Sequence, residues 1–329
     1  MADALSNTMS DLLDRKPTAA VGKLVFKSTG ESPFTFTLDF DAQQTSEDYQ
    51  TKVTLHLEGS DPEGINVDMT VGSEAIFISE KNEGYVKLDE LEEAVNDAVA
   101  ADPQYQATAD AVMPFIKKID GQWIKLDTKS LAETGLTESE HQLNACSDAF
   151  KELRVKPEDK GAIKDIFKRN QFAIATEKLP KQDIDGEDSF HYKLDLNEVA
   201  SVKFAKELIE LESFKMFKSA CEIKTEDFDD ELERLEENAA DHESGQHTED
   251  ETKESIIELW VGAETRLPTK LRITWEDEEL TVEFDTKVKI NAGGISIKAP
   301  EDFITMEEFM AELQAIGEAS NPSNLLFGL

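Results

Sequence analysis

Histidine and cysteine build most metal sites and nucleophilic centres, and this chain has five histidines and two cysteines. His242 and His247 alone approach a metal-binding spacing, and they lie in a strongly acidic stretch. The short motifs of serine hydrolases, zinc proteases, dinucleotide-binding folds and P-loops do not occur. Pairs of carboxylates can act as general acid and base, but among 71 of them no pair stands out. We therefore expect no enzyme, no metal site and no cofactor.

The two cysteines, Cys146 and Cys221, each lie in or at the end of a predicted helix. Both helices should cover the same face of a sheet, so the two thiols could form one disulfide. Two buried free thiols are the alternative. An even count without a C-x-x-C motif fits an exported protein better than a redox enzyme.

The charge excludes several classes of partner. The 329 residues carry 34 basic and 71 acidic side chains, a formal charge of −37. Such a polyanion repels nucleic acids and anionic membrane surfaces, and the apolar runs are too short to span a bilayer. Part of the charge is concentrated at 225–255, which we expect to be a flexible acidic loop because it has too few apolar residues to offset the entropy of ordering. A calcium site there is disfavoured because the EF-hand ligand spacing is missing.

Around these residues, two stretches of the chain alternate apolar and polar side chains with a period of two, which predicts antiparallel strands with one buried face. The first stretch covers 22–28, 34–42, 51–59, 64–72, 75–79, 85–89 and 122–127. The second covers 172–177, 189–196, 256–262, 269–277, 280–290 and 295–299.

Helical periods separate and flank these strands. We expect helices in 2–14, 89–118, 138–169, 199–221 and 305–316, the last with Thr305 and Glu308 at the spacing of a capping box. The fold class is thus α+β: a strongly curved antiparallel sheet, or half-barrel, of about 11–13 strands whose concave apolar face is covered by helices. We expect a single domain, 1–329, with helical insertions at about 89–118 and 130–170.

Three segments resemble a known family, the bacterial extracytoplasmic lipoproteins of the LolA-like fold, including its LppX-like relatives. QWIKLD at 122–127 is similar to a strand of that family. DIDGEDSFHYKLDL at 183–196 is similar to its hairpin, with Gly186, His191, Tyr192 and Asp195 in place. IELWVGAETRLPTKLRI at 257–273 matches a third motif at Trp260, Leu267, Pro268 and Lys270, but has Val261–Gly262 where the family has Ile-Asp.

The resemblance implies a half-barrel around an apolar cavity that binds a lipid or an acyl chain without covalent chemistry. It also implies an extracytoplasmic protein of the cell envelope whose signal and lipid anchor have been removed, and which reaches the membrane only through that missing anchor. These implications rest on analogy of fold.

The apolar face itself supports a lipid ligand, because the chain has 18 phenylalanines against four tyrosines, and rings without hydroxyls need no hydrogen-bond partner. We expect a monomer that binds a lipid or acyl chain and no nucleic acid. The alternative is a surface scaffold or interaction module of the same fold whose cavity is filled by side chains. The residues expected to line the cavity are Phe34, Phe36, Leu38, Phe40, Leu55, Leu57, Val67, Met69, Ile273, Trp275, Val282 and Phe284.

Overall fold

The computed structural model describes residues 16–29, 33–45, 48–60, 66–78, 80–81, 83–126, 157–221, 232, 234, 255–277 and 279–319. The predicted helix at 2–14, Cys146 and nearly all of the predicted acidic loop lie outside these residues.

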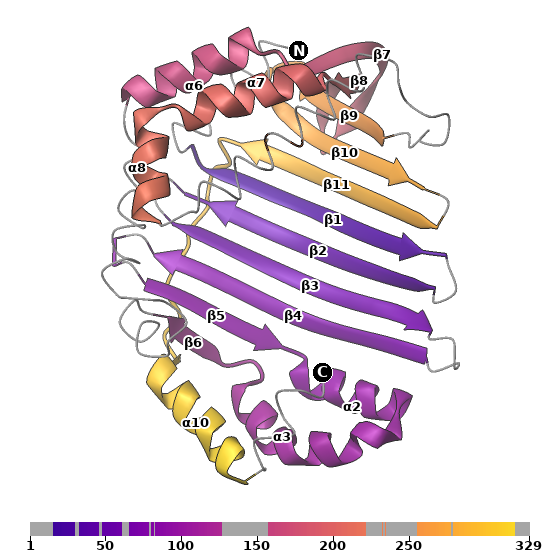
Figure 1. Cartoon of the computed structure of the whole chain (residues 1–329), viewed down its shortest axis with the longest axis vertical. Coiled ribbons are helices and arrows are strands. Elements are labelled where there is room, and N and C mark those ends of the chain that lie inside the picture. The colour runs from indigo at the N-terminus through magenta and orange to yellow at the C-terminus, as the bar shows by residue number, and fades with distance from the viewer. Residues whose placement is uncertain are drawn as a thin grey trace. The chain divides into compact units, whose positions relative to one another are not determined.

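The described residues form an α+β fold, as predicted. Twelve strands make one open, mostly antiparallel sheet in the order β12-β6-β5-β4-β3-β2-β1-β11-β10-β9-β8-β7, and the described residues include six α-helices (Figure 1). Contacts divide the chain into two compact units. Unit 1 holds β7 to β10 with α6, α7 and α8, and unit 2 holds β1 to β6, β12, most of β11 and the remaining helices. The single domain expected from the sequence stays a prediction.

Unit 2 is built around the first meander, whose strands lie side by side in Figure 1. Its strands are β1 (Thr18–Ser28), β2 (Phe34–Gln44), β3 (Tyr49–Ser60), β4 (Asn66–Ile78), β5 (Glu83–Asp89), β6 (Trp123–Leu126), β11 (Leu280–Ile290) and β12 (Ile304–Thr305). Its helices are α2 (Leu91–Ala101), the short 3-10 helix η1 (Pro103–Tyr105), α3 (Gln106–Ile119) and α10 (Met306–Ala319).

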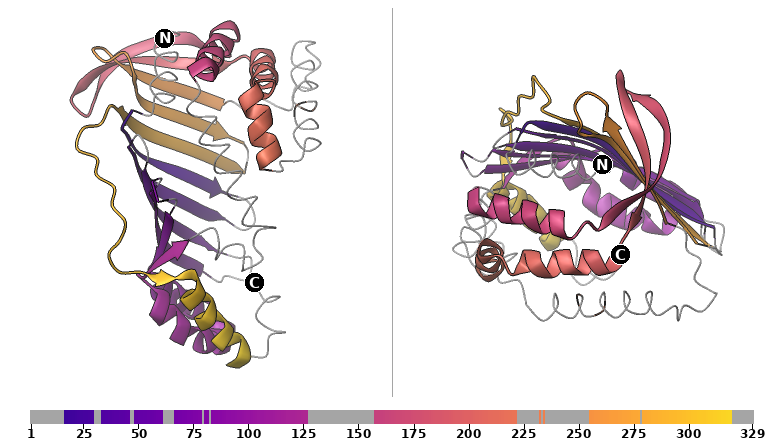
Figure 2. Two further views of the ribbon diagram at one scale, coloured as in Figure 1. Left: turned by 90° about the vertical axis from the view of Figure 1, so that its left-hand side faces the viewer. Right: turned by 90° about the horizontal axis from the view of Figure 1, so that it is seen from above.

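Unit 1 contains the second meander and a helical layer. Figure 2 shows its three helices together on one side of its strands. The strands are β7 (Ala173–Ile184), β8 (Glu187–Leu196), β9 (Ser255–Gly262) and β10 (Pro268–Glu276). The helices are α6 (Pro157–Arg169), α7 (Glu198–Ile209) and α8 (Glu212–Ala220).

The structure differs from the predicted strands at two places. The predicted strands at 64–72 and 75–79 are one 13-residue strand, β4, because Gly72 is buried inside it against Asp89 of β5 and does not form a turn. The segment 295–299, predicted as a strand, has no strand pairing. Instead, Ile297 and Ala299 pack on a buried cluster of Ile76, Ile78 and Tyr85. The connection from β11 to β12 runs along the sheet, in yellow in Figure 2.

The predicted helix at 199–221 is also divided, into α7 and α8, with Leu211 in an extended conformation between them. The predicted capping box of the last helix is confirmed. Thr305 N–H donates to Glu308 Oε2 at 2.8 Å, and Glu308 N–H donates to Thr305 Oγ1 at 3.2 Å. The hydrogen bond from the Thr305 backbone lowers the pKa of Glu308.

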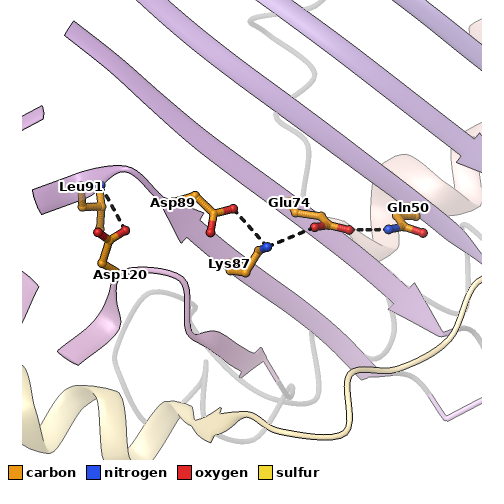
Figure 3. A network of polar contacts seen from close by, with 6 residues as sticks. All are labelled: Gln50, Glu74, Lys87, Asp89, Leu91 and Asp120. Carbon is orange, nitrogen blue, oxygen red and sulfur yellow. Dashed lines mark hydrogen bonds and ion pairs between the residues drawn. The ribbon is translucent and has the colours of Figure 1, made fainter. Parts of the chain in front are cut away.

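Helix α2 lies against β4. Strand β5 pairs with only the second half of β4, Gly72–Ile78. The helix therefore covers an edge of the strand that would otherwise be free to pair with another chain. Its first turn is held by a residue from beyond α3. The carboxylate of Asp120 accepts a hydrogen bond from Leu91 N–H (Figure 3) and another from Glu92 N–H. These donors have no partner inside the helix.

A polar network crosses the neighbouring strands (Figure 3). Lys87 Nζ lies 3.1 Å from Asp89 and 3.4 Å from Glu74, which also hydrogen-bonds Gln50. Burial by itself lowers the pKa of Lys87, but the two carboxylates outweigh it and raise that pKa. The lysine is thus held in its charged form, and it ties β3, β4 and β5 together.

A second polar group, the half-buried Glu83 of β5, joins β5 to β6. Glu83 accepts hydrogen bonds from Lys125 Nζ at 2.6 Å and from the Tyr85 hydroxyl at 2.7 Å. These two bonds lower the pKa of Glu83. Burial, helped by the bond to Glu83, raises the pKa of Tyr85 to about 12.

We expect the Glu83→Gln variant to be less stable than the parent by about 1.5–3 kcal/mol at pH 7, the range for hydrogen bonds to charged groups. Since the folded pKa of Glu83 is below its unfolded value of 4.5, its contribution is present above that pH and is lost as the pH falls through the folded pKa. Denaturant unfolding at pH 7 and pH 3 measures this. A difference in stability that is as large at pH 3 as at pH 7 would contradict it.

No helix within the described ranges is both long and apolar enough to cross a membrane.

Candidate ligand-binding face

One face of unit 2 is a continuous apolar surface, which we call the apolar face. It consists of the even-numbered residues of β1 and β2 and the odd-numbered residues of β3 and β4, and the register aligns them in rows across the strands. One row reads Phe26, Phe36, Leu57 and Met69, and the next reads Leu24, Leu38, Leu55 and Val71. The opposite face, which we call the polar face, carries such rows as Lys27, Thr35, Glu58 and Asp68.

A glycine lets the apolar face continue across β1 to β11. The rings of Phe40 and Phe284 stack with centroids 6.0 Å apart and an interplanar angle of 10°. Gly22 lies on the strand between them, and a Cβ atom there would be 2.4 Å from the ring of Phe40 and 2.7 Å from the backbone oxygen of Asp285. The stack therefore requires a residue without a side chain at this position.

We expect Gly22→Val to destabilise the protein by about 1–3 kcal/mol, the usual cost of overpacking. The branched side chain cannot fit unless Phe40 moves or β1 separates from β11. Chemical denaturation measures the loss. The matched change Gly293→Val is expected to have a smaller effect, because no atom lies within 4 Å of a Cβ built at Gly293.

The residues of the apolar face are only partly buried. Not one of the twelve residues predicted to line a cavity belongs to the buried core of the described residues. Phe34 is 41% exposed, and the other eleven are half-buried. By contrast, Tyr85 and Ile76 in the same unit are at most 6% exposed. The apolar face therefore stays accessible although it is the most apolar surface of the meander.

The structure brings most of the predicted cavity residues together. All except Ile273 and Trp275 lie in unit 2, and Ile273 and Trp275 lie on β10 of unit 1. Four further residues of the same rows were not predicted, although the alternation of apolar and polar side chains along their strands indicates them. They are Leu24, Phe26, Val53 and Val71.

A hollow of about 570 Å³ opens where β1 to β4 meet their turns. Phe34 and Val67 of the predicted cavity contribute to its wall, together with Lys27, Glu58 and Asp68. This mixture of apolar and charged groups suits the end of an amphipathic ligand better than the middle of an acyl chain.

Unit 1 has its own apolar cluster. Leu194, Ile257, Leu259 and Val261 are buried together on one face of β8 and β9. The half-buried side chains packed against this cluster are Tyr192, Leu271 and Ile273. Trp275 lies further along β10 on the same face as Ile273.

The residues that carry the family resemblance meet on the other face of unit 1. His191 stacks on Trp260 with centroids 4.1 Å apart, and Lys270 Nζ lies 5.0 Å from the centroid of the same indole. The indole N–H of Trp260 donates to Gln182 Oε1 at 3.0 Å. Three of the matching positions, which come from two separate motifs, thus form one packed row across β8, β9 and β10.

His191 also contacts a carboxylate. Its Nε2 lies 2.9 Å from Glu258 Oε1, and because a carboxylate can only accept, Nε2 is the donor. Its Nδ1 is buried without a hydrogen-bond partner among the described residues. The nearby Ser189 is fully buried, and its hydroxyl bonds to Thr269 and to the Glu187 backbone. Among the described residues no bond joins Ser189 to His191, so these residues do not form a nucleophile relay.

Cys221 follows the last turn of α8 and is disulfide-bonded. Its predicted partner, Cys146, lies outside the described residues. Within those residues, no three His, Cys, Asp or Glu side chains gather in a way that could hold a metal ion.

Comparison with known proteins does not identify a family for this chain. No family model matches the chain, and no curated protein matches its sequence. Among solved structures, the fold is similar to the crystal structure of MucB, with 12% identity and a TM-score of 0.26. That match covers 92% of this chain and 64% of the MucB chain, so this chain spans less than two thirds of that protein. At this TM-score we draw nothing about function from the match.

Proposed function

We propose that this protein is a non-enzymatic lipid-binding protein that holds an acyl chain on the apolar face of unit 2. The observation that carries the proposal is the partial exposure of that face. Rows of Phe, Leu, Val and Met side chains lie in register across four strands, yet none of the predicted cavity residues is fully buried.

The free energy available to a ligand there is large. Apolar area that leaves water contributes about 25 cal/mol per Å², and monomeric proteins seldom expose contiguous apolar patches of more than a few hundred Å². The phenylalanines have no polar atom that a hydrocarbon would leave without a partner. An acyl chain is long, flexible and apolar, so it could lie along the rows of the face and cover their side chains.

The polar groups favour binding over chemistry. The one buried histidine–carboxylate contact among the described residues, His191 with Glu258, is packed beneath Trp260. His191 is 5% exposed and Trp260 3% exposed. A general base must come within hydrogen-bond reach of a substrate proton, and this packing leaves no room for a substrate. We infer that the contact stabilises the fold.

We also propose an extracytoplasmic location in the cell envelope. The disulfide at Cys221 supports this location, because disulfides persist in oxidising compartments and are rare in the cytosol.

Native mass spectrometry of the purified protein, paired with organic extraction, tests the proposal. We expect adducts with the mass of a lipid, and we expect them to disappear after denaturation, delipidation and refolding and to return when lipid is added. A protein that carries no lipid and takes up none after refolding would contradict lipid binding. That result would favour the alternative, a surface scaffold or interaction module of the same fold whose cavity is filled by side chains.

A further inference from the structure

Three cationic side chains surround one aromatic ring in unit 1. The Nζ atoms of Lys181 and Lys178 lie 4.5 Å and 5.1 Å from the centroid of Phe190, and the guanidinium carbon of Arg266 lies 5.3 Å from it. The ring is half-buried, and the three cationic residues are exposed. We call these three residues the cationic cluster.

The cluster is assembled from distant parts of the sequence. Lys178 and Lys181 come from β7, whereas Arg266 comes from the turn between β9 and β10. Arg266 has a φ of 58°, a left-handed conformation that residues other than glycine rarely adopt. Hydrogen bonds from Arg266 N–H to Gly262 O and from Gly262 N–H to Leu267 O hold this turn. Unusual backbone of this kind gathers at ligand sites.

The cluster has no anionic partner among the described residues. Neither lysine forms an ion pair there, nor does Arg266, although the chain has 71 acidic side chains and 34 basic ones. Because all three point at one ring, they lie within about a Debye length of one another at physiological salt and repel. The attraction of a phenyl face for a cation is weak at exposed sites. An anion that contacts the three cations beside the ring would offset the repulsion.

The position of the cluster indicates what kind of anion it would bind. Phe190 pairs with Val261 in the register, and Tyr192 pairs with Leu259 and with Lys178. Phe190 and Lys178 therefore lie on the same face as the apolar cluster of unit 1, at its end. An amphiphile placed there would have its charged end among the three cations and its hydrocarbon against half-buried apolar side chains such as Tyr192.

We propose that Lys178, Lys181 and Arg266 bind the phosphate of an anionic phospholipid whose acyl chains contact the apolar side chains of unit 1. This inference rests on the proposal that the protein binds lipid, and it assigns to unit 1 a site of its own for an anionic lipid, in addition to the apolar face of unit 2. A guanidinium can hold two phosphate oxygens at once, and the two ammonium groups add point charges. The ligand is a single lipid molecule and not a bilayer surface, because a chain of net charge −37 is repelled by an anionic membrane.

Isothermal titration calorimetry with two short-chain probes tests the headgroup preference. Dihexanoyl-phosphatidylglycerol is anionic, and dihexanoylglycerol has the same chains without the phosphate. Both are used as monomers in solution. A basic residue close to an anionic lipid strengthens binding about fivefold, so three predict a preference for the anionic probe on the order of 100-fold. Glycerol 3-phosphate, which has no acyl chain, is expected to bind much more weakly than the anionic lipid.

The variant Lys178→Gln with Lys181→Gln and Arg266→Gln is expected to lose this preference and to keep its affinity for the neutral probe. The matched control is Lys23→Gln with Lys52→Gln and Lys289→Gln, which removes the same charge at exposed positions on β1, β3 and β11. The control is expected to keep the preference. Thermal unfolding of both variants checks that they fold.

The inference is overturned if the parent binds the two lipids equally, if the control loses as much preference as the cluster variant, or if glycerol 3-phosphate binds as tightly as the anionic lipid. In each of these cases binding of the neutral probe still supports the proposal that the protein binds lipid. If the parent binds neither lipid, the proposed function fails together with the inference.

Discussion

Replacing Trp260 with alanine is expected to destabilise the protein by about 3–5 kcal/mol, the range for removal of a buried large aromatic side chain. The indole is 3% exposed, with His191 stacked on it and Lys270 5.0 Å from its centroid. Its loss leaves a cavity across β8, β9 and β10 and takes the stacking partner from a histidine that is itself buried. It also removes the indole N–H that donates to Gln182 Oε1 at 3.0 Å. Urea or guanidinium unfolding measures the loss.

Two comparisons separate packing from polar contacts. Trp260→Phe keeps a stacked ring and loses the bond to Gln182, so we expect a cost of about 1–2 kcal/mol. Trp123→Ala is expected to cost less than Trp260→Ala, because Trp123 is only half-buried on β6. A Trp260→Ala variant that loses less than about 1 kcal/mol would contradict the packing described for this row.

Placing a charge in the middle of the apolar face should abolish most lipid binding. Leu55 lies in register between Leu38 and Val71. We expect Leu55→Glu to weaken acyl-chain binding about 10- to 100-fold, because burying a leucine-sized apolar surface contributes about 1.5–3 kcal/mol and the carboxylate would have to lose water as well. Displacement of a fluorescent fatty acid from the delipidated protein measures the change.

The matched control is Val25→Glu. Val25 is also a half-buried apolar residue of the meander, but it lies on the polar face, in register with Thr37. Both variants should lose similar amounts of stability, and Val25→Glu should bind as the parent does. Equal losses of binding in the two variants would show that the apolar face is not where the chain binds.

Much of the fold follows from local patterns in the sequence. Side chains that alternate in 34–40 and 51–57 predict both the strands and the faces on which Phe36 and Leu55 lie. The spacing of Thr305 and Glu308 predicts the cap of α10. These features depend on residues close in sequence, and their physical causes, the pleat of a strand and the unpaired N–H groups of a helix, act over a few residues.

The rest depends on contacts between distant segments. A glycine such as Gly72 is a turn signal in isolation, and only the presence of Asp89 beside it shows that the strand continues. The segment 295–299 alternates like a strand, yet Ile297 and Ala299 have a buried cluster to cover and no strand pairing. The sheet order places β1 beside β11, a pairing that no local pattern indicates.

The candidate sites also combine features that local sequence patterns predict with features that depend on contacts between distant segments. Ten of the predicted cavity residues could be assigned to one face because they alternate along their strands, whereas Gly22 could be explained only once Phe40 and Phe284 were seen to stack across it. The cationic cluster could not be predicted, since Lys178 and Arg266 are far apart in sequence and converge on Phe190 only through the pairing of β7, β8 and β9.

The most direct test of lipid binding is to map where an acyl chain lies. A fatty acid with a photoactivatable diazirine in the middle of its chain would be bound to the delipidated protein and irradiated, and the labelled residues identified by peptide mass spectrometry. Lipid binding on the apolar face predicts labels on Phe36, Leu38, Leu55 and Leu57, and competition by unlabelled fatty acid should remove them. Labels concentrated on the polar face, at residues such as Thr37 and His56, or labels that no competitor reduces, would contradict it.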